Sequence, residues 1–360
     1  MHLRGLFVIL CVSIGATLGP ASPADAQDKG HVVVASWGGT YQDALRQTIF
    51  QPFEKETGIK VIEATGPTLP KLRATINSGR PEWDLAEVQP EDYVQLTRDG
   101  MLQRLDYGTM NRETFADFPK EAVQPFGVGT FVYAKVIAFS TKKYTQANGP
   151  KSWADVWDVK KFPGPRIFEA NSLPGALTIE YALLADGVPP EKLYPIDLKR
   201  GYAALSVIKP NVVKWVLVSA TALDALISGE AVIGSVQQSR VQTAKEQGAP
   251  VDYVWNQALT TYSFWSIPKG AKNVQNAQKL IEFASRPESQ AALAKMVVLG
   301  PLNRKAYDFI PAERQKLLPT SPENRAKTIE LNPGWWVSKD ASGRTHREIS
   351  GAMWNLWAQQ

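Results

Sequence analysis

Residues 31–64 read HVVVASWGGTYQDALRQTIFQPFEKETGIKVIEA and contain the pattern that decides the fold. The valine-rich run at 31–36 is typical of a strand that is buried on both faces. Apolar residues then recur at helical spacing until Gly58, which predicts a helix that ends there. Residues 59–64 predict a second strand. A strand, a helix and a second strand in this order form the repeating unit of a parallel sheet that is covered by helices.

The same alternation of strands and helices continues through two blocks of the chain. We therefore predict an α/β protein with two lobes, each a mostly parallel sheet flanked by helices. Lobe 1 is predicted to comprise residues 27–139 and 261–318, and lobe 2 residues 140–260. Strands near 139 and 261 would form the hinge. Residues 319–360 are predicted to be a loop and a helix that packs on the body through Ile349, Met353, Leu356 and Trp357.

The first 26 residues have the features of a cleaved signal peptide. Arg4 precedes an apolar stretch at 6–18 that is too short to span a bilayer, and Ala24-Asp25-Ala26 is a small-residue cleavage site. We therefore expect export to the periplasm. The single cysteine, Cys11, lies inside this segment. The mature chain is thus expected to have no disulfide and no thiolate nucleophile.

Composition and motifs argue against several classes of function. The net charge is +5, but the basic residues are interspersed with acids, so we expect no nucleic-acid binding. Only two histidines follow the signal segment, and GxSxG, HExxH and P-loop motifs are absent from the sequence. We expect no catalytic activity, no metal and no cofactor. The alternative is a serine hydrolase that uses Ser140 and Lys143, which match Ser-x-x-Lys. Gly127-Val-Gly129 is predicted to be a loop.

Aromatic residues at strand ends are the stronger signal for a binding site. Trp37 ends the first strand beside Gly38, Gly39 and Tyr41. Ligands of open α/β sheets bind at the carboxyl ends of the strands, so this turn is predicted to line a cleft. Aromatic rings there would attract an ammonium and bury methylene groups. The other aromatic residues fall into two groups, further cleft candidates and residues of the core. Trp335-Trp336 in a Pro-Gly loop, Tyr93 and the strand-ending Trp255 are further cleft candidates, whereas Trp153, Trp157, Trp215, Trp354 and Trp357 are predicted to be core.

Several segments resemble one protein family in the family's order. They are FEKETGIKV after the WGGTY turn, PKSWADVWDVKKFPGP, SGEAVIGSV, WSIPKGAKNVQNAQKLIEFASRPESQ and LGPLNRKAY. Together they resemble the periplasmic solute-binding proteins of ABC importers, in the spermidine/putrescine-type branch that includes relatives binding γ-aminobutyrate. The resemblance extends from about 31 to 336.

The resemblance implies a type II-like periplasmic-binding-protein fold, whose two lobes close on a ligand and then dock on a membrane permease. It also implies a monomer without catalytic activity. The ligand contacts that it implies are Trp37, Gly38, Gly39, Tyr41, Gln89, Asp92, Tyr93, Glu169, Asn171, Ser219, Gln237, Gln238, Ser263, Trp335 and Trp336. Asp92 or Glu169 would pair with an ammonium.

The sequence departs from polyamine binders at three of the implied contact positions. Gln237 replaces an aromatic residue, Ser263 an aspartate and Leu299 a tyrosine. These replacements remove part of the aromatic box and one carboxylate. We therefore expect a smaller or zwitterionic amine, such as γ-aminobutyrate, beside the polyamines. Ferric iron or another polar metabolite is the alternative ligand.

Overall fold

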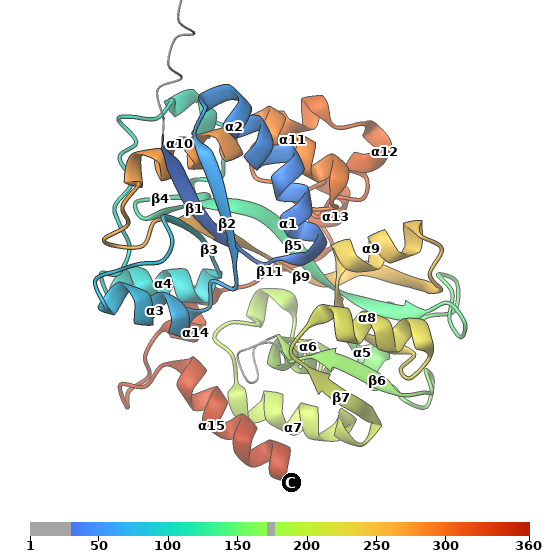
Figure 1. Cartoon of the computed structure of the whole chain (residues 1–360). Coiled ribbons are helices and arrows are strands. Elements are labelled where there is room, and N and C mark those ends of the chain that lie inside the picture. The colour runs from blue at the N-terminus through green and yellow to red at the C-terminus, as the bar shows by residue number, and fades with distance from the viewer. Residues whose placement is uncertain (1–29, 171–176) are drawn as a thin grey trace, which may run out of the picture.

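The computed structural model describes residues 30–170 and 177–360, so the predicted signal peptide and Asn171 lie outside the described residues (Figure 1). The strands of this part form one eleven-stranded sheet with the path β2-β1-β3-β9-β5-β8-β6-β7. They are β1 (His31–Ser36), β2 (Lys60–Thr65), β3 (Leu85–Val88), β4 (Val123–Gln124), β5 (Gly127–Ser140), β6 (Arg166–Glu169), β7 (Val212–Val216), β8 (Ile233–Gln237), β9 (Val251–Ser266), β10 (Gly300–Pro301) and β11 (Thr328–Glu330).

Helices cover both faces of this sheet. They are α1 (Gly39–Leu45), α2 (Gln51–Thr57), α3 (Leu69–Asn77), α4 (Pro90–Arg98), α5 (Trp153–Trp157), α6 (Thr178–Ala185), α7 (Leu198–Ile208), α8 (Ser219–Ser228), α9 (Gln238–Glu246), α10 (Val274–Ser285), α11 (Pro287–Met296), α12 (Ala312–Gln315), α13 (Pro322–Arg325), α14 (Pro333–Val337) and α15 (His346–Gln359). The predicted α/β class is confirmed.

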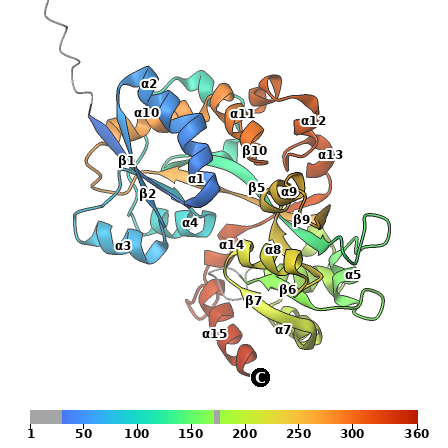
Figure 2. The same ribbon diagram turned by 45° about the vertical axis from the view of Figure 1, so that its right-hand side comes forward.

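Two long strands connect the halves of the molecule. β5 and β9 pair antiparallel from Val128↔Trp265 to Ser140↔Val251 and run from one half into the other in both views (Figures 1 and 2). Their register is irregular between Lys135 and Ile137. The predicted hinge positions do not face each other, because Phe139 pairs with Asp252 and Thr261 pairs with Tyr133. We keep the names lobe 1 and lobe 2 for the predicted ranges, and the division itself stays a prediction.

The segment from β1 to α4 has the strand and helix boundaries that its valines, Gly58 and Pro90 predict. β1 pairs parallel with β2 and with β3, and its Val32 and Val34 are buried in one hydrophobic cluster with Leu45 and Phe53 of the adjoining helices. Gly58 ends α2 in the left-handed region at φ 75°, which costs glycine little. Pro90 occupies the first turn of α4, where its missing N–H loses no helical hydrogen bond.

Three expectations about local structure are wrong. Gly127 and Gly129 lie in β5 rather than in a loop. A Cβ at either position would come within 2.6 Å of Ser266 Oγ or Leu302 Cδ1, so close packing explains these glycines. The strand predicted to end at Trp255 continues through it as β9. Trp335 and Trp336 lie in the short helix α14, which Asn332 caps through the Trp335 N–H.

The C-terminal helix packs on lobe 2, close to α7 in both views (Figures 1 and 2). Trp357 is buried and donates through Nε1 to Ser206 Oγ, while Tyr202 donates to the Ser350 carbonyl. Leu356 was predicted on the packed face but is exposed, so the contact face is rotated toward Ser350. The predicted core tryptophans Trp153, Trp157, Trp215, Trp354 and Trp357 all belong to or pack against one hydrophobic cluster.

Candidate ligand-binding site

The turn after β1 presents an indole to solvent. Trp37 follows the last residue of β1 and is 37% exposed, which is high for an indole. Gly38 and Gly39 both have positive φ, 70° and 61°, and a Cβ at Gly38 would contact Thr65. Glycine is therefore required for the chain to leave the strand and enter α1 within two residues. The backbone of this turn keeps Trp37 at the surface instead of folding it into the core.

Tyr41 and Glu87 form a buried polar pair inside lobe 1. Glu87 Oε1 accepts hydrogen bonds from Tyr41 Oη at 3.0 Å and Thr130 Oγ1 at 3.4 Å, while Oε2 has no partner. Burial raises the pKa of Glu87 to about 8, against which these two donors act only partly. Glu87 is thus protonated at neutral pH. The hydroxyl of Tyr41 points to this carboxyl group.

The first turn of α4 carries four polar or aromatic side chains with different partners. Gln89 Oε1 accepts from Tyr133 Oη at 3.0 Å, and Tyr93 stacks on Phe264 with ring centroids 4.0 Å apart. Asp92 Oδ1 forms an ion pair with Arg347 Nη1 at 2.9 Å. Glu91 forms no ion pair among the described residues, although the charge of Arg347 lowers its pKa. Burial, with the charge of Asp92, raises the pKa of Glu91 to about 7.

Glu91 is one of the residues that the sequence reasoning missed, as are Tyr133, Lys135 and Glu180. It lies within the segment 89–93, but an acid in the first turn of a helix is favoured by the helix dipole and therefore looks structural. The available signal was that two adjacent acids follow Pro90. One of them was sufficient for the helix terminus, so the second required a separate explanation.

A buried ion pair joins the predicted lobes at the site, with Lys135 in lobe 1 and Glu169 in lobe 2. Lys135 Nζ in β5 lies 2.7 Å from both carboxylate oxygens of Glu169, the last residue of β6. The two side chains are only 8% and 6% exposed. Ser219 also donates to Glu169 Oε2, and its Oγ accepts from the Gln237 N–H at 2.8 Å. The carboxylate of Glu169 is therefore already paired with the ammonium of Lys135 and hydrogen-bonded to the hydroxyl of Ser219.

Glu180 and Trp336 form a second buried cluster. Trp336 is 2% exposed, and its Nε1 donates to Glu180 Oε1 at 2.8 Å. Tyr194 Oη donates to the same oxygen at 2.9 Å, whereas Glu180 Oε2 has no partner. Burial raises the pKa of Glu180. Because α14 also packs against α4, Trp336 links the carboxylate of α6 to the helix that carries Glu91.

The remaining expected contacts lie in different surroundings. Gln237 is half-buried at the end of β8 and donates to Ser239, and Ser263 is buried in β9. Gln238 is fully buried and donates to Tyr253 Oη at 2.8 Å and the Leu317 carbonyl at 3.3 Å. Trp335 stacks on His346 with ring centroids 4.1 Å apart. The roles of these side chains as ligand contacts stay predictions.

The charges that raise the pKa values of Tyr133 and Glu91 show which residues lie near one another. The pKa of Tyr133 is raised well above its ordinary value, first by burial and then by the charges of Glu91 and Glu169. The charge of Glu180 in turn contributes to the raised pKa of Glu91. We call this group the interlobe site. It comprises Gln89, Glu91, Tyr133, Lys135, Glu169, Glu180 and Trp336.

The described residues give no support to the two alternative chemistries. Within this part of the chain, no three histidine, cysteine or acidic residues cluster in a way that could hold a metal ion. Ser140 is buried and its hydroxyl donates to the Pro250 carbonyl at 3.4 Å, while Lys143 Nζ lies over the Tyr144 ring. Among the described helices, none is sufficiently long and apolar to span a membrane.

Comparison with known proteins agrees with this architecture. Residues 48–320 match the family model for bacterial extracellular solute-binding proteins. The chain is 31% identical to the gamma-aminobutyric acid-binding protein of Pseudomonas aeruginosa over 94% of its length and 93% of that protein. It is 24% identical to the spermidine/putrescine-binding periplasmic protein of Escherichia coli, over 94% and 95%.

A solved structure shows the same fold. The crystal structure of an ABC transporter substrate-binding protein from Bradyrhizobium japonicum aligns with a TM-score of 0.84 at 32% sequence identity. The alignment covers 91% of this chain and 99% of that protein. The expected periplasmic-binding-protein fold is thereby confirmed, as is the expected resemblance to solute-binding proteins.

Proposed function

The chain belongs to the family of bacterial extracellular solute-binding proteins, and we propose that it captures a small amine-bearing solute in the periplasm and delivers it to the permease of an ABC importer. The protein would act by binding alone and release its ligand unchanged. The relatives support this class of ligand, because γ-aminobutyrate, spermidine and putrescine each carry a primary amine.

One observation carries the proposal for this chain. Two carboxylates of the interlobe site, Glu91 in α4 and Glu180 in α6, form no ion pair with a lysine or arginine among the described residues, although the charge of Arg347 acts on Glu91 from a greater distance. Asp92 and Glu169, the acids expected from sequence, already have Arg347 and Lys135 as partners. An ammonium that leaves water needs a carboxylate or an aromatic face. Glu91, Glu180 and the Trp336 ring together provide both kinds of partner.

The same two groups explain why binding would close the lobes. Ionised Glu91 and Glu180 repel each other across the interface, which favours an open arrangement when no cation is present. A bound ammonium replaces that repulsion with two attractive interactions. Closure then excludes water and strengthens both of them, as expected for hinge-closing binding proteins. Lys135 lies nearby and could attract the carboxylate of a zwitterionic ligand.

Calorimetric titration of the mature protein with γ-aminobutyrate, putrescine and spermidine tests the proposal. We expect at least one to bind, and Glu91→Gln to weaken that binding about 10- to 100-fold by removing one charged hydrogen bond. Glu313→Gln is the matched control, because the Glu313 side chain is 85% exposed on α12. Spermidine should bind less tightly than the shorter amines, since two carboxylates leave its third ammonium unpaired.

Two results would contradict the proposal. One is that none of the three amines binds while a dicarboxylate or an uncharged metabolite does. The other is that Glu91→Gln and Glu313→Gln bind the amine as tightly as the unmodified protein. Release of a chemically altered ligand would instead indicate an enzyme.

A further inference from the structure

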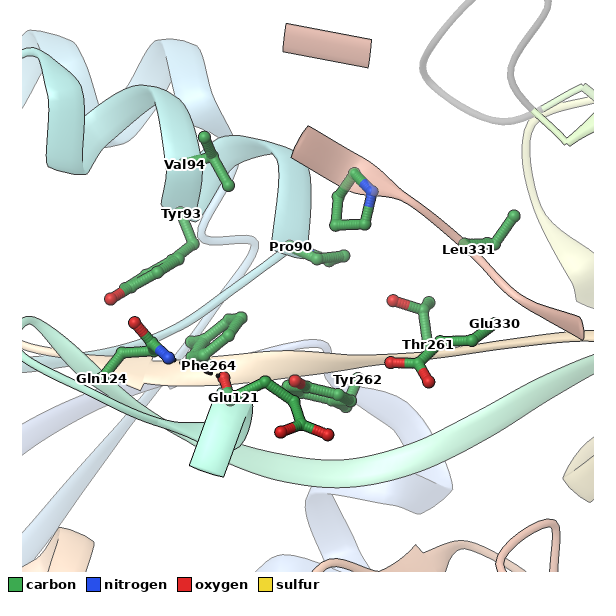
Figure 3. A pocket seen from close by; sticks show the side chains of 11 residues that line it. Pro90, Tyr93, Val94, Glu121, Gln124, Thr261, Tyr262, Phe264, Glu330 and Leu331 are labelled. Carbon is green, nitrogen blue, oxygen red and sulfur yellow. Dashed lines mark hydrogen bonds between the residues drawn. The ribbon is translucent and has the colours of Figure 1, made fainter. Parts of the chain in front are cut away.

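Lobe 1 contains a separate pocket, which shares only Tyr93 with the ligand contacts expected from the sequence. It lies on the α4 side of the sheet, between α4, β9 and the segment from 330 to 333, with a volume of about 230 Å³ (Figure 3). All of its lining residues belong to lobe 1 or to that C-terminal segment, and none comes from lobe 2. The pocket is therefore distinct from the interlobe site, although Pro90 lines it next to Glu91.

Aromatic rings form the floor of this pocket. Phe264 stacks under Tyr93 with centroids 4.0 Å apart, and Tyr262 lies beside it with centroids 5.3 Å apart. Pro90 forms part of the opposite wall (Figure 3). Ring faces carry negative potential, so such a floor accommodates methylene groups and attracts a cation.

Two carboxylates flank the Tyr262 ring. Glu121 and Glu330 come from separate segments on either side of it (Figure 3). Neither forms an ion pair with a lysine or arginine in the part of the chain that the structure describes. Partial burial of its carboxyl group and the charge of Glu121 raise the pKa of Glu330, while the charge of Arg325 lowers it, so the two acids lie close enough to repel each other. A cation between them would remove this repulsion.

A hydroxyl without a protein partner provides an independent sign of a ligand. Thr261 in β9 is 7% exposed as a residue, its hydroxyl makes no hydrogen bond with the described residues, and its oxygen is open to the pocket rather than enclosed by protein. Its side chain lies at the end of the pocket nearest the carboxylate of Glu330 (Figure 3). The hydroxyl of an otherwise buried threonine therefore faces the pocket without a protein partner and can hydrogen-bond a molecule that enters it.

We propose that this pocket binds a small aliphatic ammonium compound independently of the interlobe site. The ammonium donates three hydrogen bonds, and Glu121, Glu330 and Thr261 offer oxygen acceptors for them. The alkyl part lies on Tyr262 and Phe264. A carboxylate ligand would be repelled by the two acids, and an apolar ligand would leave the Thr261 hydroxyl unpaired.

The test uses ¹⁹F NMR of the full mature protein labelled with 3-fluorotyrosine, with 1,4-diaminobutane as the probe. Loss of one signal in Tyr262→Phe assigns the Tyr262 resonance. We expect that resonance to shift saturably in the unmodified protein, and equally in Glu91→Gln, whose interlobe site is weakened. In the double variant Glu121→Gln/Glu330→Gln, the apparent affinity should fall at least about tenfold. Thr261→Val should weaken it less, and Glu313→Gln should not change it.

Three outcomes would overturn this inference. The first is a Tyr262 resonance that never shifts. The second is a shift with the same affinity in the double variant, which would place the probe elsewhere. The third is a shift that disappears in Glu91→Gln, because the signal would then report lobe closure rather than this pocket. Since Glu121 and Glu330 are exposed in the free protein, the double variant should remain folded, and its other fluorotyrosine signals verify that.

Discussion

The two walls of the interlobe site use their carboxylates in the same way. The lobe 1 wall has Asp92, which pairs with Arg347, beside Glu91, which forms no ion pair among the described residues. The lobe 2 wall has Glu169, which pairs with Lys135, and Glu180, which likewise forms none in that part of the chain. Each wall thus has one neutralised acid and one that is available. Under the proposed function, the acids that form no ion pair recognise the ligand.

The two walls differ in how deeply the neutralised pair is buried. Lys135 and Glu169 are 8% and 6% exposed, whereas Arg347 and Asp92 are 23% and 12% exposed. Removing one partner of a buried pair leaves an uncompensated charge away from water, and the cost falls as solvent access increases. The comparison therefore predicts a graded set of effects.

Lys135→Met should have the largest effect. It leaves Glu169 without its cation, and we expect a loss of about 3–5 kcal/mol in the free energy of unfolding, measured by urea denaturation. Lys245→Met is the matched control, because the Lys245 side chain is 46% exposed and its pairing with Asp252 should contribute about 1 kcal/mol or less. If both variants lost the same small amount, the pair of Lys135 and Glu169 would not stabilise the lobe 2 wall.

Glu87 also forms no ion pair among the described residues, and it predicts a pH dependence of the free energy of unfolding. Its pKa is raised to about 8 in the folded protein, above its ordinary value of 4.5, so the folded state binds more protons between these values. Stability should therefore fall as pH rises, by on the order of 2 kcal/mol from pH 5 to pH 7. Glu87→Gln should remove this part of the pH dependence in urea denaturation. A variant whose stability curve parallels that of the unmodified protein would contradict the assignment.

Glu91 predicts a pH dependence of ligand binding. Its pKa of about 7 in the free protein means that the ionised form increases from pH 6 to pH 8, while an alkyl ammonium stays protonated. Amine affinity should rise about tenfold over this range, equivalent to about 1.4 kcal/mol, in titrations corrected for buffer ionisation. In Glu91→Gln the affinity should be nearly constant with pH. An affinity that falls with rising pH would show that recognition uses another group.

Arg347→Met should have the smallest effect. Its ion pair with Asp92 is more exposed than that of Lys135, so we expect a loss of about 1 kcal/mol or less in urea denaturation. Arg304→Met, at a side chain that is 79% exposed, should change stability even less. A loss as large as that of Lys135→Met would remove the distinction between the two walls.

Much of the fold could be predicted from local patterns. The valines of β1, the glycine that ends α2 and the proline that opens α4 act through contacts within a few residues, so the sequence shows them directly. The turn at Trp37 was likewise located, because strand ends and glycines are local features. The continuity of β9 through Trp255 was missed, since it depends on pairing with β5 and β11 rather than on its own composition.

The sequence by itself determined the α/β alternation, the strand-end turn at Trp37 and the core positions of Trp153 and Trp357. Only the tertiary structure decided which carboxylates are neutralised. Asp92 meets Arg347 across 255 positions and Glu180 meets Trp336 across 156, and no local pattern encodes such contacts. The physical reason is that strand and helix patterns reflect short-range sterics and periodic burial, whereas the charge state of a buried acid depends on every group that folding brings near it.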